Sequence, residues 1–239
     1  MKYLDLNLLE PIENLACDEV LINWCAQHPG LEVLRVWEPS RYFVVVGYSN
    51  KVAVEVNRAA CAADGVPVLR RCSGGGAVLQ GPGCLNYTLV FSHEEDGPFG
   101  DLGHSYRFVL ERHRGLFASM TGVPVAIEGS SDLVVAGRKF SGNSQYRKRR
   151  NFLIHGTFLL QLDLSRVARY LPMPSKEPTY RQRRPHGEFL QNLGIAATDA
   201  KQGLRRVWAA EEQIAPPPLL VINKMMQERY SRPQWNLKF

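Results

Sequence analysis

The sequence lacks an apolar stretch of the roughly 18 residues that a membrane-spanning helix needs. Its first residues include Asp5, Glu10 and Glu13 and show no basic start followed by an unbroken apolar run, so we expect no secretory signal peptide. Internal repeats and low-complexity tracts are also missing. These absences argue against a membrane partner and predict a cytoplasmic protein.

Cysteine is scarce, because the chain holds five and none of them forms a C-x-x-C pair. The odd number and the spacing argue against a disulfide framework and against a zinc site, and the histidines show no metal-ligand spacing either. We therefore predict no metal site built from a protein motif. The expected reduced thiols, several of them small buried hydrophobic side chains, are Cys17, Cys25, Cys61, Cys72 and Cys84.

The charge is unbalanced, since 29 Lys and Arg residues oppose 23 Asp and Glu residues and leave a formal net charge of +6. Much of the excess lies in Arg138–Arg150 and Arg181–Arg184. A basic surface attracts nucleic acid, phosphorylated ligands or an acidic protein. Because aromatic residues do not alternate with the basic ones as on a stacking platform, nucleic acid is the weakest of these partners.

The 239 residues, 45% of them hydrophobic, suffice for one large domain with a sizeable core. Periodicity and turn residues predict helices over Pro11–Trp24 (with Asn14 as N-cap), Arg58–Asp64, Tyr106–Met120, Ser165–Leu171 and Leu219–Tyr230. They predict a polar loop over His93–Gly103 and strands over Leu31–Trp37, Tyr42–Gly47, Val66–Arg71, Leu85–Phe91, Val123–Ile127, Asp132–Ala136, Arg138–Ser141 and Asn151–Leu162. One α+β domain over residues 1–239 accounts for this order.

A glycine-rich loop follows the strand predicted over Val66–Arg71, with the sequence Arg-Arg-Cys-Ser-Gly-Gly-Gly-Ala from Arg70 to Ala77. Consecutive glycines leave N–H groups uncovered and permit positive φ, so the loop can wrap an anion. Arg70 and Arg71 would add charge-assisted contacts to phosphate or carboxylate. The loop lacks the ending of a P-loop and the spacing of a dinucleotide fingerprint. A glycine-rich hairpin with solvated arginines is the alternative.

A second candidate motif runs from Asp132 to Gly142 and contains Gly137-Arg138-Lys139. If Gly137 turns the chain between two strands, Lys139 leaves the second strand, and Ser141 and Gly142 leave room for a ligand beside its ammonium. A lysine placed in this way can bind an acyl carboxylate and then an acyl adenylate. The alternative is a surface lysine in a basic hairpin, which is the commoner situation for lysine.

A third candidate, His155-Gly156-Thr157, lies on a predicted strand. A buried histidine beside glycine can hydrogen-bond the loop that holds a ligand, and a satisfied core histidine is the alternative. Asp18 and Glu19 are interpreted as solvated or helix-end charges.

Together, and in this order over Asn14–Leu162, these segments resemble the catalytic domain of the lipoate–protein ligase A, octanoyltransferase and biotin ligase superfamily. The best match is to the lipoate–protein ligase A type, because biotin ligases differ in loop and lysine motif. The matching segments are Arg70–Val78 with Leu85–Thr88, Gly137–Gln145, His155–Thr157 and Asn14–Ala16. The resemblance implies a mixed β-sheet flanked by helices in a single catalytic domain. The small C-terminal accessory domain that such ligases often carry is not evident in this sequence.

The resemblance also implies an enzyme that works in two steps. Lipoate or octanoate attacks ATP to give acyl-AMP, with Mg²⁺ entering on the ATP. A lysine of an acceptor lipoyl domain, in an E2 subunit or an H-like protein of glycine cleavage, then takes the acyl group. Lys139 would be catalytic. The implied ATP and acyl-AMP site comprises Arg71, Ser73, Gly74, Gly75, Gly76, Ala77, Val78, Leu79, Asn86, Asp132, Lys139, Ser141, Gly142, His155, Gly156 and Thr157.

Three departures keep alternatives open. Gln80 stands where ligases of this type often have histidine. Without an accessory domain, ATP activation would require a separate partner chain or would not occur. Octanoyltransferases use a cysteine thioester, yet no cysteine follows Cys84. Cys72 and Cys84 flank the glycine loop, and the arginines beside them would have to lower the pKa of either thiol to make it reactive.

The alternatives are a transferase that moves octanoyl or lipoyl groups between carrier proteins without ATP, and a carrier-binding module without catalysis. Arg181–Arg184 is a hypothetical steering surface for an acidic acceptor domain.

Overall fold

The computed structural model describes residues 1–93, 99, 101–148 and 150–239. A large mixed sheet has the strand order β1-β2-β6-β10-β9-β8-β7, in which only β1 and β2 run parallel. A small sheet has the order β4-β3-β5. The strands are β1 (Lys2–Asp5), β2 (Val33–Trp37), β3 (Phe43–Val46), β4 (Val68–Arg70), β5 (Val78–Gln80), β6 (Cys84–Ser92), β7 (Val125–Glu128), β8 (Asp132–Val135), β9 (Arg138–Arg147) and β10 (Asn151–Leu159).

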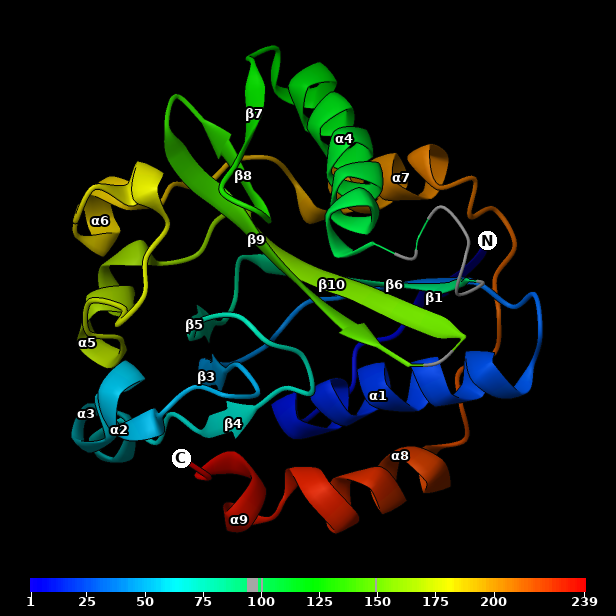
Figure 1. Ribbon diagram of the computed structural model, residues 1–239, viewed down its shortest axis with the longest axis horizontal. Helices are drawn as coiled ribbons and strands as arrows, with labels where there is room; N and C mark the ends of the chain where they lie inside the picture. Colours follow the sequence, from blue (N-terminus) through cyan, green and yellow to red (C-terminus); the bar gives the residue numbers. More distant parts are fainter. Residues whose placement is uncertain (94–98, 100, 149) are drawn as a thin grey trace.

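Helices cover both faces of the large sheet (Figure 1). On one face, α4 (Leu102–Thr121) and α7 (Ala197–Val207) pack against each other and enclose an aromatic-rich core. On the other face lies α1 (Pro11–Gln27), and α8 (Leu219–Met225) and a π-helical turn (Met226–Tyr230) pack outside it. The predicted α+β class, with a mixed sheet flanked by helices, is therefore confirmed.

Short helices surround the small sheet and the end of β10. They are α2 (Val52–Glu55), α3 (Arg58–Ala63), η1 (Leu164–Arg166), α5 (Val167–Tyr170), η2 (Thr179–Arg181), α6 (His186–Phe189) and α9 (Pro233–Asn236). Among the described residues, no helix combines the length and apolar character that a membrane span demands. The polar loop expected over residues 93–103 lies largely outside the described residues, and its last two residues begin α4.

Several predicted boundaries are wrong for identifiable reasons. Helix α1 begins at Pro11 after an N-cap at Glu10, which forms a capping box with Glu13. Asn14, the expected N-cap, lies inside the helix, where its side chain bonds the carbonyl of Leu8. Strand β9 extends to Arg147 because it pairs with β10 along its length. Strands β1 and β5 were missed, since four and three residues carry too little pattern.

A β-bulge interrupts the pairing of β8 with β9. Leu133 pairs with Ser141 and Val134 pairs with Lys139, so Phe140 is an extra residue on β9. The Phe140 ring is fully buried in the core beside Phe117. Lys139, on the opposite side of the strand, is left half-buried and faces a cavity.

Candidate active site

A cavity of about 480 Å³ lies where the glycine loop, β9, β10 and the segment 171–190 meet. This volume falls within the range of small-molecule sites. Ser73 and Gly74 are not part of its lining and support the wall from behind. The other predicted site residues line it together: Arg71, Gly75, Gly76, Ala77, Val78, Leu79, Asn86, Asp132, Lys139, Ser141, Gly142, His155, Gly156 and Thr157.

The glycine loop is held by its carbonyl groups. Arg71 donates from Nη2 to the carbonyls of Gly74 and Gly76, and from Nε to the Ser73 hydroxyl at 3.1 Å. Ser144 on β9 donates to the same Gly74 carbonyl at 2.8 Å. Gly75 has a φ of +89°, a left-handed conformation that glycine adopts without strain. Burial lowers the pKa of Arg71 to about 10, so the guanidinium stays charged at neutral pH.

Because the carbonyls are bonded behind the loop, its N–H groups are left for a ligand. Among the described residues, no group accepts a hydrogen bond from the backbone N–H of residues 74–77. Gly75 and Gly76 are exposed at the cavity mouth. Consecutive unpaired N–H groups beside a buried guanidinium form an anion-binding concavity.

Arg70 does not belong to this site, contrary to the sequence-based expectation. Its guanidinium is fully buried and donates to main-chain carbonyls of two segments, among them Gly47 at 2.6 Å and Lys238 at 2.5 Å. Trp235 and Asn236 accept further bonds from it. The residue therefore ties the C-terminal segment to the loop after β3.

Lys139 is paired with a carboxylate that also accepts a hydrogen bond from a tyrosine hydroxyl. Its Nζ lies 2.8 Å from Oδ1 of Asp132, and Tyr180 donates to Oδ2 of Asp132 at 2.7 Å. A Cβ built at Gly142 would lie 2.7 Å from this Nζ, so glycine is what makes room for the ammonium. From the sequence we expected this space to hold a ligand, whereas the lysine side chain itself fills it.

A buried hydrogen-bonded chain supports the loop from the large sheet. His155 contacts the Ser73 hydroxyl through Nε2 at 2.5 Å and Asp18 through Nδ1 at 2.9 Å. Asp18 also accepts from Arg35 at 2.8 Å and from Thr88 at 2.7 Å. Since a carboxylate only accepts, His155 Nδ1 carries a proton. His155 thus bonds the ligand loop, as one of the two sequence-based interpretations held.

The interpretation of Asp18 and Glu19 as solvated or helix-end charges is wrong. Both are buried, and Glu19 accepts from Tyr230 at 2.8 Å and from Arg229 at 2.5 Å. Burial by itself would raise the pKa of Asp18, but the bond from His155 and the Arg35 charge outweigh it and lower this pKa. Asn14 and Asp18, one helical turn apart, both face Arg35, a spacing that could have indicated the buried cluster.

Two further regions belong to the cavity wall, and only the second was missed from sequence. Gln80 donates to Thr157 at 2.5 Å, and Thr157 donates to Asn86 at 2.5 Å, so a chain of side-chain hydrogen bonds joins the strands β5, β10 and β6. One apolar part of the wall contains Leu15, Trp37, Phe43 and Val45, which belong to the same buried cluster. These residues come from α1, β2 and β3, and their apolar patterning alone says only that they are buried.

The thiols are unsuited to nucleophilic chemistry. All five are buried. Burial raises the pKa of Cys72 well above its ordinary value and that of Cys84 to about 12. Arg70 and Arg71 do not produce the thiolate that the sequence analysis considered, because the first is bonded to distant carbonyls and the second to the glycine loop. The expectation of buried structural cysteines is confirmed.

One known family matches most of the chain. The model of the lipoyl protein ligase A/B catalytic domain matches residues 10–196, which include the glycine loop, the lysine motif and His155. The chain belongs to this family.

The curated relatives of this chain include both ligases and octanoyltransferases. A probable lipoate-protein ligase A of Mycoplasma pneumoniae is 28% identical over 95% of this chain and 68% of its own length. An octanoyltransferase LipM of Carboxydothermus hydrogenoformans is 30% identical over 72% of this chain and 69% of its own length. The chain spans 68%, 47% and 57% of three curated ligase relatives.

Solved structures agree on the fold. A lipoate-protein ligase A bound with ATP superimposes with a TM-score of 0.83 at 21% identity, covering 99% of this chain and 98% of its own. The bi-partite lipoate protein ligase of Thermoplasma acidophilum, described with its E2 lipoyl domain, gives 0.83 at 20% identity over 99% and 95%.

Proposed function

We propose that this protein attaches lipoate or octanoate to a lysine of an acceptor lipoyl domain by way of an acyl adenylate. The observation that carries the proposal is the convergence of Lys139 with the unpaired N–H groups of the glycine loop in one cavity. ATP in a ligase of the same fold and the ligase relatives within the family support it.

The arrangement suits the first half-reaction. The acyl carboxylate attacks the α-phosphate of ATP, the bond to pyrophosphate breaks, and acyl-AMP forms. Negative charge develops on phosphate oxygens, and fixed donors facing it need no reorganisation. Arg71, the loop N–H groups and Lys139 would supply these donors. The Mg²⁺ would enter bound to the phosphates of ATP, because both carboxylate oxygens of Asp132 are already engaged by Lys139 and Tyr180.

The same groups suit the second half-reaction. The acceptor lysine attacks the acyl carbonyl, an amide forms, AMP leaves and the amine loses a proton. No protein nucleophile is required, which agrees with the buried cysteines. Lys139 would face both the acyl carbonyl and the phosphate. The part of the cavity walled by Leu15, Trp37, Phe43 and Val45 would take the acyl chain.

A transferase that moves acyl groups between carriers without ATP is the second candidate, favoured by the LipM relative. Its thioester would need a reactive thiol, and all five cysteines here are buried, which raises their pKa. If activation of lipoate requires a separate accessory chain, as the bi-partite ligase suggests, the transfer step alone would belong to this chain.

The decisive experiment separates the two half-reactions. Purified protein is given an acceptor lipoyl domain with ATP, Mg²⁺ and lipoate, or with synthetic lipoyl-AMP, or with octanoyl carrier protein, and the acceptor mass is measured. A ligase acts on the first two, a transfer-only subunit on the second, and a transferase on the third. Lys139→Ala should abolish transfer and leave the melting temperature nearly unchanged. Full activity of that variant would refute the assigned role.

A further inference from the structure

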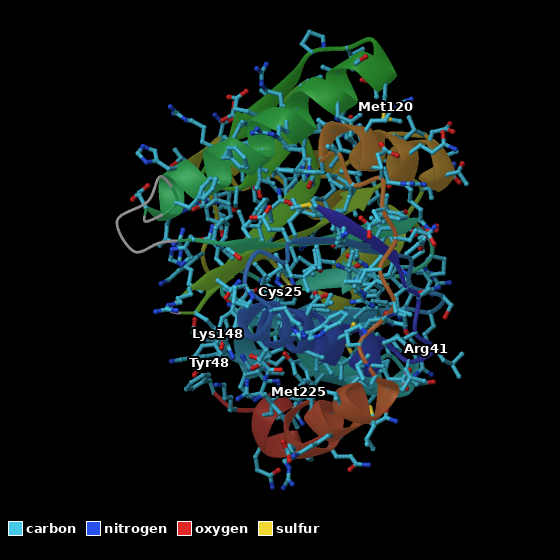
Figure 2. All side chains as sticks on the ribbon, turned by 90° about the vertical axis from the view of Figure 1, so that its right-hand side faces the viewer. Cys25, Arg41, Tyr48, Met120, Lys148 and Met225 are labelled. Carbon is cyan, nitrogen blue, oxygen red and sulfur yellow. The ribbon has the colours of Figure 1, made fainter. Side chains whose placement is uncertain are left out.

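A partly exposed surface of mixed cationic and aromatic character lies next to the glycine loop. We define the basic–aromatic surface as Tyr48, Tyr146, Lys148, Trp235 and Lys238. Lys238 Nζ lies 3.6 Å from the ring centroid of Tyr48 and 4.5 Å from that of Trp235, and Lys148 Nζ lies 6.0 Å from that of Tyr146. Figure 2 shows Tyr48 and Lys148 on the same side of the molecule.

This surface is continuous with the active site through one face of β9. Successive side chains of a strand point to opposite faces, so Gly142, Ser144 and Tyr146 share a face. Gly142 makes room for the Lys139 ammonium, and Ser144 bonds the glycine loop at Gly74. Tyr146 is the next residue on that face, and Lys148 follows it.

A second connection runs through the loop after β3. The backbone N–H of Tyr48 donates to the Ser73 carbonyl at 2.8 Å, so Tyr48 is attached directly to the glycine loop. Its side chain is 46% exposed. A protein that brings a lysine to the cavity would therefore meet this surface as it approaches the loop.

The two ammonium groups of this surface have no carboxylate partner. Within the described part of the chain, Lys148 and Lys238 form no ion pair with a carboxylate side chain, and Lys148 donates to the neutral amide of Asn23. Tyrosine and tryptophan are enriched in protein interfaces. Ammonium groups without a carboxylate partner complement an acidic face of a partner protein.

The connector that the sequence analysis considered for steering is less suited to this role. Arg181 is buried, with Nε 3.6 Å from Glu177. Arg184 donates to the main-chain carbonyls of Gly137, Tyr180 and Arg181. Of the arginines in that segment, Arg183 alone is classed as exposed.

We propose that the basic–aromatic surface is the docking site for an acidic face of the acceptor domain. The assignment rests on the proposed function, because it presupposes that a partner lysine enters this cavity. Electrostatic attraction would speed the encounter, and the aromatic side chains would hold the acceptor while its lysine reaches the acyl carbonyl.

The test uses synthetic lipoyl-AMP as donor and compares two nucleophiles, an acceptor lipoyl domain and hydroxylamine. Lys148→Glu/Lys238→Glu should lower kcat/KM for the acceptor domain roughly tenfold or more at low salt, mainly through KM. Added salt should reduce the difference from wild type. Transfer to hydroxylamine should be retained. Arg114→Glu, on α4 across the large sheet, and Arg183→Glu, on the connector, should both behave as wild type.

The outcomes separate this proposal from the proposed function. Absence of transfer to either nucleophile by wild type would contradict the function. An unchanged acceptor KM in the double variant, or a loss in Arg183→Glu instead, would overturn the docking site. Loss of low-salt oligonucleotide binding with intact acceptor kinetics would assign the surface to nucleic acid and would also overturn it. If Lys148→Glu/Lys238→Glu fails to fold, Lys148→Gln/Lys238→Gln should show a smaller rise in acceptor KM.

Discussion

Replacing Asp18 by asparagine should expose how much stability the buried chain beneath the glycine loop contributes. The substitution keeps the size of the side chain but removes the negative charge 2.8 Å from the fully buried Arg35. Removing one partner of a buried ion pair costs about 3–5 kcal/mol, because the other charge stays desolvated. In a chain of this size, a loss of about 1 kcal/mol lowers Tm by about 2–4 °C, so Tm should fall by roughly 6–20 °C.

Asp163→Asn is the matched control, since Asp163 also pairs with an arginine, at 3.1 Å from Arg166, but with both side chains 47% exposed. Asparagine can still accept the bond from the Ser165 N–H. Urea unfolding of the two variants should therefore separate them clearly, with the control close to wild type. Equal midpoints for both variants would refute the assignment of the Asp18–Arg35 pair as a major element of stability.

The pH dependence of the same comparison gives a second measurement. The folded state lowers the pKa of Asp18, so its ionisation stabilises the fold above the unfolded pKa of about 3.9. This contribution is lost as pH falls through the lower folded pKa. The stability difference between wild type and Asp18→Asn should be constant from neutral pH down to about pH 5 and then shrink. A difference that grows towards acid would contradict the lowered pKa.

Two further predictions follow from the space and burial around the site. Gly142→Ala places a Cβ 2.7 Å from Lys139 Nζ, so acyl transfer should fall about 100-fold while Tm changes little, as measured by intact mass and a thermal melt. An unaltered transfer rate would show that the ammonium need not occupy this space. Iodoacetamide at pH 8 should leave the native protein unmodified and alkylate all five cysteines in urea, and rapid native labelling of Cys72 would reopen the thioester route.

The glycine loop and the lysine motif could be predicted because each is a local signal. Consecutive glycines, and the glycine turn before Lys139, predict the local backbone conformation independently of the surrounding packing. The roles of the two arginines were harder. Arg70 and Arg71 are neighbours at the end of β4, so their side chains point to opposite faces. One therefore reaches the C-terminal segment and the other the glycine loop.

Asp18 shows why the rest of the site was not predictable. Its partners Arg35, Thr88 and His155 lie 17, 70 and 137 positions away along the chain. A carboxylate on a helix reads as solvated unless these partners are known to converge, and that depends on the strand order of the large sheet. The β2-β6-β10 neighbours bring the three residues together beneath α1.

The bulge at Phe140 links the chemistry to the docking surface. In an uninterrupted strand, Lys139 would share a face with Ser141 and Asn143, and the Asn143 amide accepts from Tyr87 on the side covered by α4. The extra residue reverses the alternation, since Leu133 pairs with Ser141 while Val134 pairs with Lys139. Lys139 therefore faces the same side as Gly142, Ser144 and Tyr146. Its ammonium and the docking residue Tyr146 lie on one side of the sheet. A β9 of the same sequence that alternated regularly through Phe140 would direct Lys139 into the aromatic core, where an unpaired ammonium is too costly to bury.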